Sequence, residues 1–197
     1  MEAKDRAKLT TLRRTAYHEA GHFVVGWYVR RGFSSVSVKP GKDSLGHVLM
    51  GRRFAGGKEH EFREAKALLA GYIAEMRAFP GLVGRDLQGG GIVDGSFSDA
   101  EEALAIVKQY CPADEAGAFS RLSGQTLARV SVLWPAIEAL ASRLLKRRTL
   151  HRREAERVIS AALLSRRALR NAVRREERSL ATSNRLVEQQ STGRPPR

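Results

Sequence analysis

The stretch YHEAGHFVVGW at residues 17–27 places two histidines and a glutamate inside an otherwise apolar segment. Buried imidazole and carboxylate groups are costly unless another group pairs with them. His18 and His22 are four residues apart, so on an α-helix they lie on one face, one turn apart. We therefore expect a core helix whose polar side chains share a partner, and a metal ion is one candidate.

Hydrophobic periodicity along the chain predicts a mainly α protein with a small antiparallel β-sheet. The expected helices cover about residues 4–31, 59–79, 98–112, 125–148 and 151–165. Two strands are expected at residues 35–39 and 45–51, on either side of the turn signal Pro40-Gly41. The first helix should close at Gly32.

The glycine-rich segment at residues 80–97 is predicted to be a loop. A helix should begin directly after it, because Ser98 and Glu101 have the spacing of a capping box. The chain is long enough for one domain with a sizeable core. We expect that domain over residues 1–165, followed by a basic, frayed tail over residues 166–197.

The net charge of +14 is spread unevenly. Residues 141–197 hold 16 Lys and Arg against 5 Asp and Glu, whereas residues 1–140 hold 19 against 16. A basic excess is typical of a solvated helix face, or of a surface that binds an acidic partner, anionic lipid or nucleic acid. No aromatic residue follows Trp134, so the stacking platforms of single-strand binders are missing there, and nucleic acid is not the expected partner.

Cysteine content and hydropathy together indicate a cytoplasmic protein. Cys111 is the single cysteine, which fits a reducing compartment. The apolar run over residues 23–29 is far shorter than the roughly 20 residues of a membrane helix. The N-terminal residues lack the apolar segment of a signal peptide.

The H-E-x-x-H spacing of His18, Glu19 and His22 is that of zinc peptidases. On one helical face the two imidazoles can both bind a tetrahedral zinc ion at about 2.0–2.1 Å. Glu19 is rotated by roughly 100° from His18, so it is placed to accept a proton from a zinc-activated water rather than to bind the metal. A catalytic zinc also needs a third protein ligand.

Three carboxylates are candidates for that third ligand. Asp99 lies in the first turn of the helix expected after the loop, near the positive end of its dipole. Asp94 lies in the loop itself, and Glu75 lies within the apolar helix 59–79, where a carboxylate needs a partner. The spacing alone does not decide between Asp99 and Glu75.

A family resemblance extends over about residues 10–160. It is carried by RRTAYHEAGHFVVG (13–26), VSVKPGKDSLGHVLM (36–50), LLAGYIAEMRAF (68–79) and GSFSDAEEALAIVK (95–108). Together these stretches resemble the peptidase domain of the FtsH-type AAA+ zinc metalloproteases. The resemblance implies one zinc ion per chain with Asp99 as third ligand and Glu75 as a supporting residue beside the ligands. It also places His47 in a strand beside the active site, where extended substrate could pair.

The chain departs from that family in several ways. Lys39, Lys42, Ala70, Tyr72 and Met76 differ from the family's common residues. The 197 residues contain no G-x-x-x-x-G-K-[ST] motif, and we expect neither an ATPase module nor a membrane anchor. The sequence does not decide whether a separate ATPase delivers substrates to this chain or whether the chain forms a homo-oligomer.

These patterns lead to the expectation of a zinc-dependent metalloendopeptidase that cleaves unfolded or flexible polypeptides. One alternative is a catalytically inactive, peptidase-like module whose basic C-terminal region binds an acidic partner or nucleic acid. Another is a nucleic-acid-binding protein with an incidental H-E-x-x-H pattern. The intact set of four chemical residues, His18, Glu19, His22 and Asp99, favours the enzyme.

Overall fold

The computed structural model describes residues 3–41, 45–50, 56–80 and 95–163. Within them the protein is mainly α-helical with one small antiparallel sheet, as the sequence predicts. In chain order the elements are α1 (Ala3–Tyr28), β1 (Phe33–Ser37), β2 (His47–Met50), α2 (Lys58–Ala78), α4 (Gly95–Tyr110), α5 (Glu115–Val132), α6 (Trp134–Arg147), β3 (Thr149–His151) and α7 (Arg152–Ala162).

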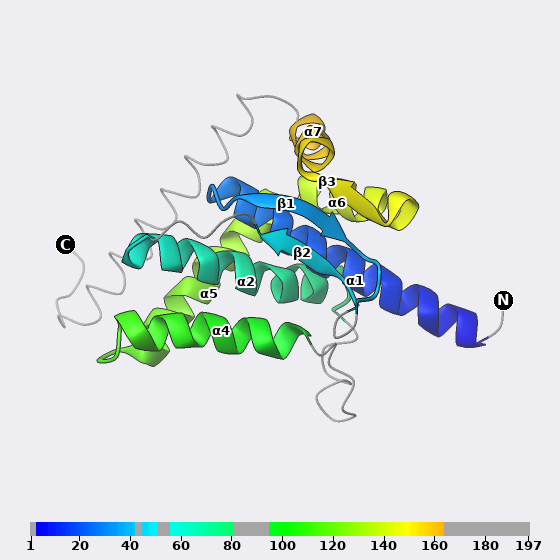
Figure 1. The fold of residues 1–197 in the computed structure, drawn as a ribbon. Helices are drawn as coiled ribbons and strands as arrows, with labels where there is room; N and C mark the ends of the chain where they lie inside the picture. The colour runs from blue at the N-terminus through cyan, green and yellow to red at the C-terminus, as the bar shows by residue number, and fades with distance from the viewer. Residues whose placement is uncertain (1–2, 42–44, 51–55, 81–94, 164–197) are drawn as a thin grey trace, which may run out of the picture.

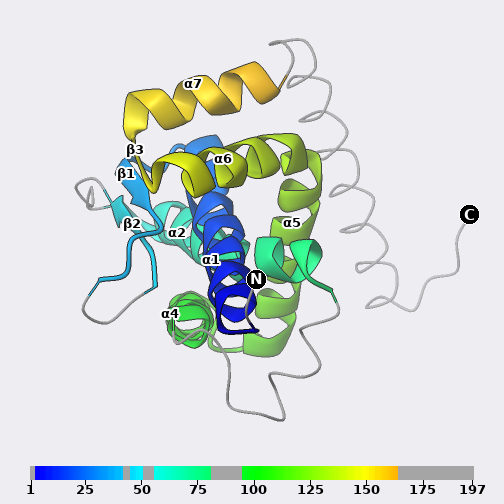
Figure 2. The same cartoon turned by 90° about the vertical axis from the view of Figure 1, so that its right-hand side faces the viewer.

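Helix α1 is the central element of the fold. The helices α2 and α6 and the sheet all pack against it (Figure 1). Figure 2 looks nearly along α1 and shows α2, α5, α6 and the sheet arranged around it. Its second half is accordingly buried on all sides, with Ala16, Ala20, Phe23, Val24 and Val25 in the core. The histidine motif lies where α1 enters this buried half.

Small residues let α1 and α2 approach each other closely. A Cβ atom added at Gly21 would lie 2.4 Å from the carbonyl oxygen of Ala70, and one added at Gly71 would lie 2.3 Å from Nε2 of His22. Only glycine fits at these two positions without a shift of the neighbouring atoms. The close approach brings the α2 backbone next to the histidines of α1.

The sheet has the strand order β2-β1-β3, with β1 antiparallel to both neighbours. Ser37 of β1 stands opposite His47 of β2 and Thr149 of β3. A Cβ atom added at Gly46, just before β2, would lie 2.6 Å from Cγ2 of Thr15 and 2.8 Å from Oε1 of Glu19. The edge strand β2 therefore begins directly against the motif face of α1.

The prediction that the first helix ends at Gly32 is wrong. α1 ends at Tyr28, and the residue with positive φ is Arg30, at 63°. The N–H of Arg31 donates to the carbonyl of Gly26 at 2.7 Å, and the N–H of Arg30 donates to that of Trp27 at 3.1 Å. These bonds are a Schellman motif that satisfies the last carbonyls of α1, so the helix ends before Gly32 is reached.

The single helix predicted over residues 125–148 is also wrong, because α5 and α6 meet at Leu133. Pro135 lies in the first turn of α6. A proline has no N–H to donate and its ring clashes with the carbonyl four residues earlier, so it cannot continue α5. The first half of α5 and the strand β3 are not predicted from the sequence.

The helix predicted from Ser98 begins three residues earlier, at Gly95. Ser98 therefore lies at the end of the first turn of α4, so the predicted start of this helix is wrong by three residues. Most of the predicted loop 80–97, Asp94 and the predicted tail 166–197 lie outside the described residues. Among the helices that are described, none combines the length and the apolar character needed to cross a bilayer.

Candidate metal centre

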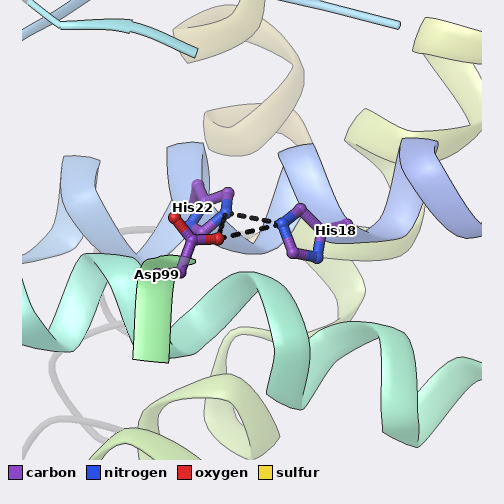
Figure 3. A group of neighbouring side chains, drawn as sticks. All are labelled: His18, His22 and Asp99. Carbon is purple, nitrogen blue, oxygen red and sulfur yellow. Dashed lines mark hydrogen bonds and ion pairs between the residues drawn. The ribbon is translucent and has the colours of Figure 1, made fainter. Parts of the chain in front are cut away.

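Three side chains from two helices converge on one point. His22 Nε2 lies 2.9 Å from His18 Nε2 and 3.1 Å from Oδ2 of Asp99. His18 Nε2 lies 3.2 Å from the same oxygen. Figure 3 shows the two imidazoles of α1 and the Asp99 carboxylate of α4 facing one another across this small triangle. Among the described residues, this is the group of His, Cys, Asp and Glu side chains whose geometry suits a metal ion.

The contacts on the far side of each imidazole orient the ring. Nδ1 of His22 lies 2.8 Å from the carbonyl oxygen of Ala67, so Nδ1 carries the proton that it donates to this carbonyl. Nδ1 of His18 lies 3.3 Å from Oε2 of Glu75, and Oε1 of Glu75 accepts a hydrogen bond from Nε of Arg14 at 2.6 Å. Both Nε2 atoms are therefore turned toward the Asp99 carboxylate.

The donor set and its spacing suit a tetrahedral ion. Ligand atoms at about 2.0–2.1 Å from a tetrahedral zinc ion are about 3.3 Å apart, close to the observed 2.9–3.2 Å. Two imidazole nitrogens and one carboxylate oxygen leave the fourth position free for a water or a substrate. A carboxylate or carbonyl next to the second nitrogen of a metal-binding histidine orients the ring, and the Ala67 carbonyl has this place at His22 and the Glu75 carboxylate, at 3.3 Å, at His18.

The electrostatics of the cluster favour a positive charge at its centre. Burial opposes protonation of His18, but hydrogen bonds to Asp99 and Glu75 outweigh it and raise the pKa of His18 from 6.5 to about 9. Burial would raise the pKa of Asp99, yet the hydrogen bonds and charges of His18 and His22 hold it well below its usual range. Burial would likewise raise the pKa of Glu75, but its bonds to His18 and Arg14 lower it. Without a metal, the cluster holds a proton at the point where a cation would sit.

Glu19 is buried beside this cluster, with 6% of its surface exposed. Burial raises the pKa of its carboxyl, although the charges of His22 and His18 act in the opposite direction. Its side chain lies against Gly46, the residue that leads into β2. His47, the first residue of β2, is half-buried and close enough to influence the Glu19 carboxyl.

The structure brings together His18, His22 and Asp99, with Glu19 adjacent. Glu75 approaches the opposite nitrogen of His18, so it stands beside the triangle rather than in it. Sequence reasoning missed two supporting groups, the guanidinium of Arg14 and the carbonyl of Ala67. It also missed Gly71, although an isolated glycine within an apolar helix is itself a signal of close packing.

Comparisons with known proteins give no assignment. A scan against protein-family models finds no match, and a search of curated proteins finds none either. The case for a function therefore depends on the geometry and electrostatics of this centre.

Proposed function

We propose that the protein is a zinc-dependent metalloendopeptidase of the FtsH peptidase type. The observation that carries the proposal is the triangle of His18 Nε2, His22 Nε2 and Asp99 Oδ2, with sides of 2.9–3.2 Å and a buried glutamate next to it. The four residues combine the H-E-x-x-H spacing with a third ligand from a distant helix.

His18, His22 and Asp99 are the residues that would hold one zinc ion per chain. When bound, zinc supplies a Lewis acid that lowers the pKa of a coordinated water toward 7 and polarises a carbonyl. The protein's own contribution is orientation. The Ala67 carbonyl fixes the ring of His22, and the pair of Arg14 and Glu75 holds that of His18.

Glu19 is the proposed general base. Its carboxylate lies next to His18 and His22, and burial raises its pKa, which makes it a better proton acceptor than an exposed carboxylate. It would take a proton from the attacking water and then give it to the amine that leaves when the peptide bond breaks. Buried surroundings keep that proton from bulk solvent between the two transfers.

The proposed substrate is an unfolded or flexible polypeptide. Within the described sheet, β2 is an edge strand that begins against Glu19, and an extended chain can add to such an edge through backbone hydrogen bonds. His47 stands at the start of that edge. A folded protein cannot present an extended segment there without first opening.

The FtsH-type resemblance, a cytoplasmic location and delivery of substrates by a separate ATPase belong to the same proposal. Its alternative is an inactive, basic interaction module. The observation in favour of this alternative is a groove between α6 and α7 whose lining includes four cationic side chains, namely Arg143, Lys146, Arg147 and Arg157. Glu154 pairs with Arg143 and Arg147, which reduces the positive charge of that groove.

The deciding experiment measures zinc content and casein cleavage on the same purified samples. The wild-type protein, Glu19→Gln and the exposed control Glu101→Gln should each carry about one zinc ion per chain. Glu19→Gln should lose cleavage by roughly 10²–10⁴-fold, because an amide cannot accept the proton, while the control cleaves normally. A wild-type protein that binds zinc but leaves casein intact would instead support the inactive module.

A further inference from the structure

A largely apolar cavity of about 460 Å³ lies where α1, the segment that follows β1 and the segment before β2 meet. Leu12, Val38 and Leu45 are among its lining residues, together with Thr11 and Thr15. This volume is within the range of roughly 300–1,000 Å³ that is usual for ligand pockets. We call it the Leu12 pocket.

The Leu12 pocket lies one helical turn from the candidate active site, because its lining residue Thr15 precedes Glu19 by four residues in α1. Thr11, Thr15 and Glu19 are spaced four residues apart in α1, so they form one row along the helix. The methyl group of Thr15 and the side chain of Glu19 both pack against Gly46. With a rise of about 1.5 Å per helical residue, Thr15 and Leu12 lie about 6 and 10 Å before Glu19 along α1. An extended peptide covers that distance in about two to three residues, at about 3.3 Å each.

The chemistry of the pocket is apolar inside and cationic at its mouth. The hydroxyl of Thr15 donates to the carbonyl of Thr11 at 3.0 Å, and the methyl group of Thr15 packs against Gly46. Leu45 is 39% exposed, so part of its side chain can contact an added apolar group. Lys39 and Arg148 also line the pocket and are exposed, so a basic side chain would be repelled from it.

We propose that the Leu12 pocket is a substrate subsite that takes one bulky apolar side chain, two or three residues from the scissile bond. This inference rests on the proposed peptidase function and deepens it by naming the substrate class. The preferred substrates are unfolded segments with Leu, Ile or Phe at that position, and segments with Lys or Arg there are rejected. Such apolar side chains are buried in folded proteins, so the subsite selects chains that have lost their core.

The test uses fluorogenic peptides with a Gly/Ser/Gln background and one variable residue, Ala, Leu, Phe, Asp or Lys. That residue is placed in turn at each of the three positions on either side of the cleaved bond. At one of these positions the wild-type protein should cleave the Leu or Phe peptide with kcat/KM roughly 10- to 100-fold above the Asp or Lys peptide. Equal values at all positions overturn the proposal.

Two variants separate a subsite from a general packing effect. Thr11→Phe places a ring in the pocket, so it should abolish the preference for Leu and Phe. Ser160→Phe, at an exposed position of α7, is the matched control and should retain the wild-type preference. A Thr11→Phe variant with the wild-type preference would overturn the proposal.

A binding measurement distinguishes failure of the subsite from failure of the peptidase. Fluorescence anisotropy gives the Kd of the same peptides for zinc-loaded Glu19→Gln and for the protein treated with EDTA. Tighter binding of Leu or Phe peptides by roughly 10-fold or more, lost in Thr11→Phe, supports the pocket even where no peptide is cleaved. Cleavage that depends on zinc and Glu19 but shows no side-chain preference in rate or in Kd leaves the peptidase intact and refutes the subsite.

Discussion

Gly71 offers a direct test of whether the triangle of His18, His22 and Asp99 is a metal site. A Cβ atom at position 71 would lie 2.3 Å from Nε2 of His22, 2.5 Å from Cε1 and 2.8 Å from Cδ2. Ordinary contacts to a Cβ atom begin near 3.4 Å, so Gly71→Ala must displace the imidazole by about 1 Å. Metal–ligand distances tolerate only about 0.2 Å. We therefore expect zinc affinity to fall by at least roughly 10- to 100-fold.

The matched control is Gly124→Ala. Gly124 lies within α5, and a Cβ atom added there meets nothing within 4 Å. This variant should bind zinc like the wild type and be more stable by about 0.5–1 kcal/mol, because alanine is the better helix former. Competition with a chromophoric chelator gives the zinc Kd, and urea unfolding gives the stability. A Gly71→Ala protein with the wild-type zinc Kd would show that His22 is not a ligand.

Three further measurements test the remaining parts of the site. Asp99→Ala should weaken zinc binding more than Glu75→Gln does, since Asp99 faces both Nε2 atoms and Glu75 only Nδ1 of His18; the reverse order in the same chelator assay would favour a glutamate-ligated site. In EDTA-treated protein the pKa of His18 is raised from 6.5 to about 9, which corresponds to about 3 kcal/mol of folding stability. That contribution is fully present below pH 6.5 and is lost as the pH rises through 9, so urea unfolding across this window should show the loss in the wild type but not in His18→Asn. Finally, the 197-residue chain has no phosphate-binding loop motif, so its cleavage of casein should not respond to ATP. A folded domain stable by about 5–15 kcal/mol should stay intact, and stimulation by ATP of the purified chain would contradict this expectation.

The sequence was informative about the site wherever helical geometry alone decides the outcome. His18, Glu19 and His22 are close in sequence, so a regular helix determines their relative directions. The choice between Asp99 and Glu75 as third ligand depends on how α2 and α4 pack around α1. The spacing of residues in the sequence carries no information about that packing. Both carboxylates reach His18, but they meet different ring nitrogens, and only the three-dimensional arrangement separates them.

The errors in the predicted elements have local physical causes. The apolar periodicity continues through Pro135, so it predicts one helix where the structure has α5 and α6. The backbone of α5 cannot continue past this proline. The turn after α1 is made by Arg30 with positive φ, a conformation that the neighbouring Gly32 would ordinarily be expected to supply. The strand β3 is three residues long and is defined by its pairing with β1, more than a hundred residues earlier, which no local pattern reveals.

The positions of the three candidate ligand atoms relate this centre to the point where α1 becomes buried. His18 and His22 belong to α1, their outer nitrogens contact Glu75 and Ala67 of α2, and Asp99 belongs to α4. A cation at the centre would therefore connect three helices at once, and its binding free energy would stabilise their packing as well as the site. The same proton or metal also neutralises two carboxylates that are largely removed from water and would otherwise repel each other. Under the proposed function, one cation would supply both catalytic placement and structural support, and its charge would offset those of the carboxylates in the core.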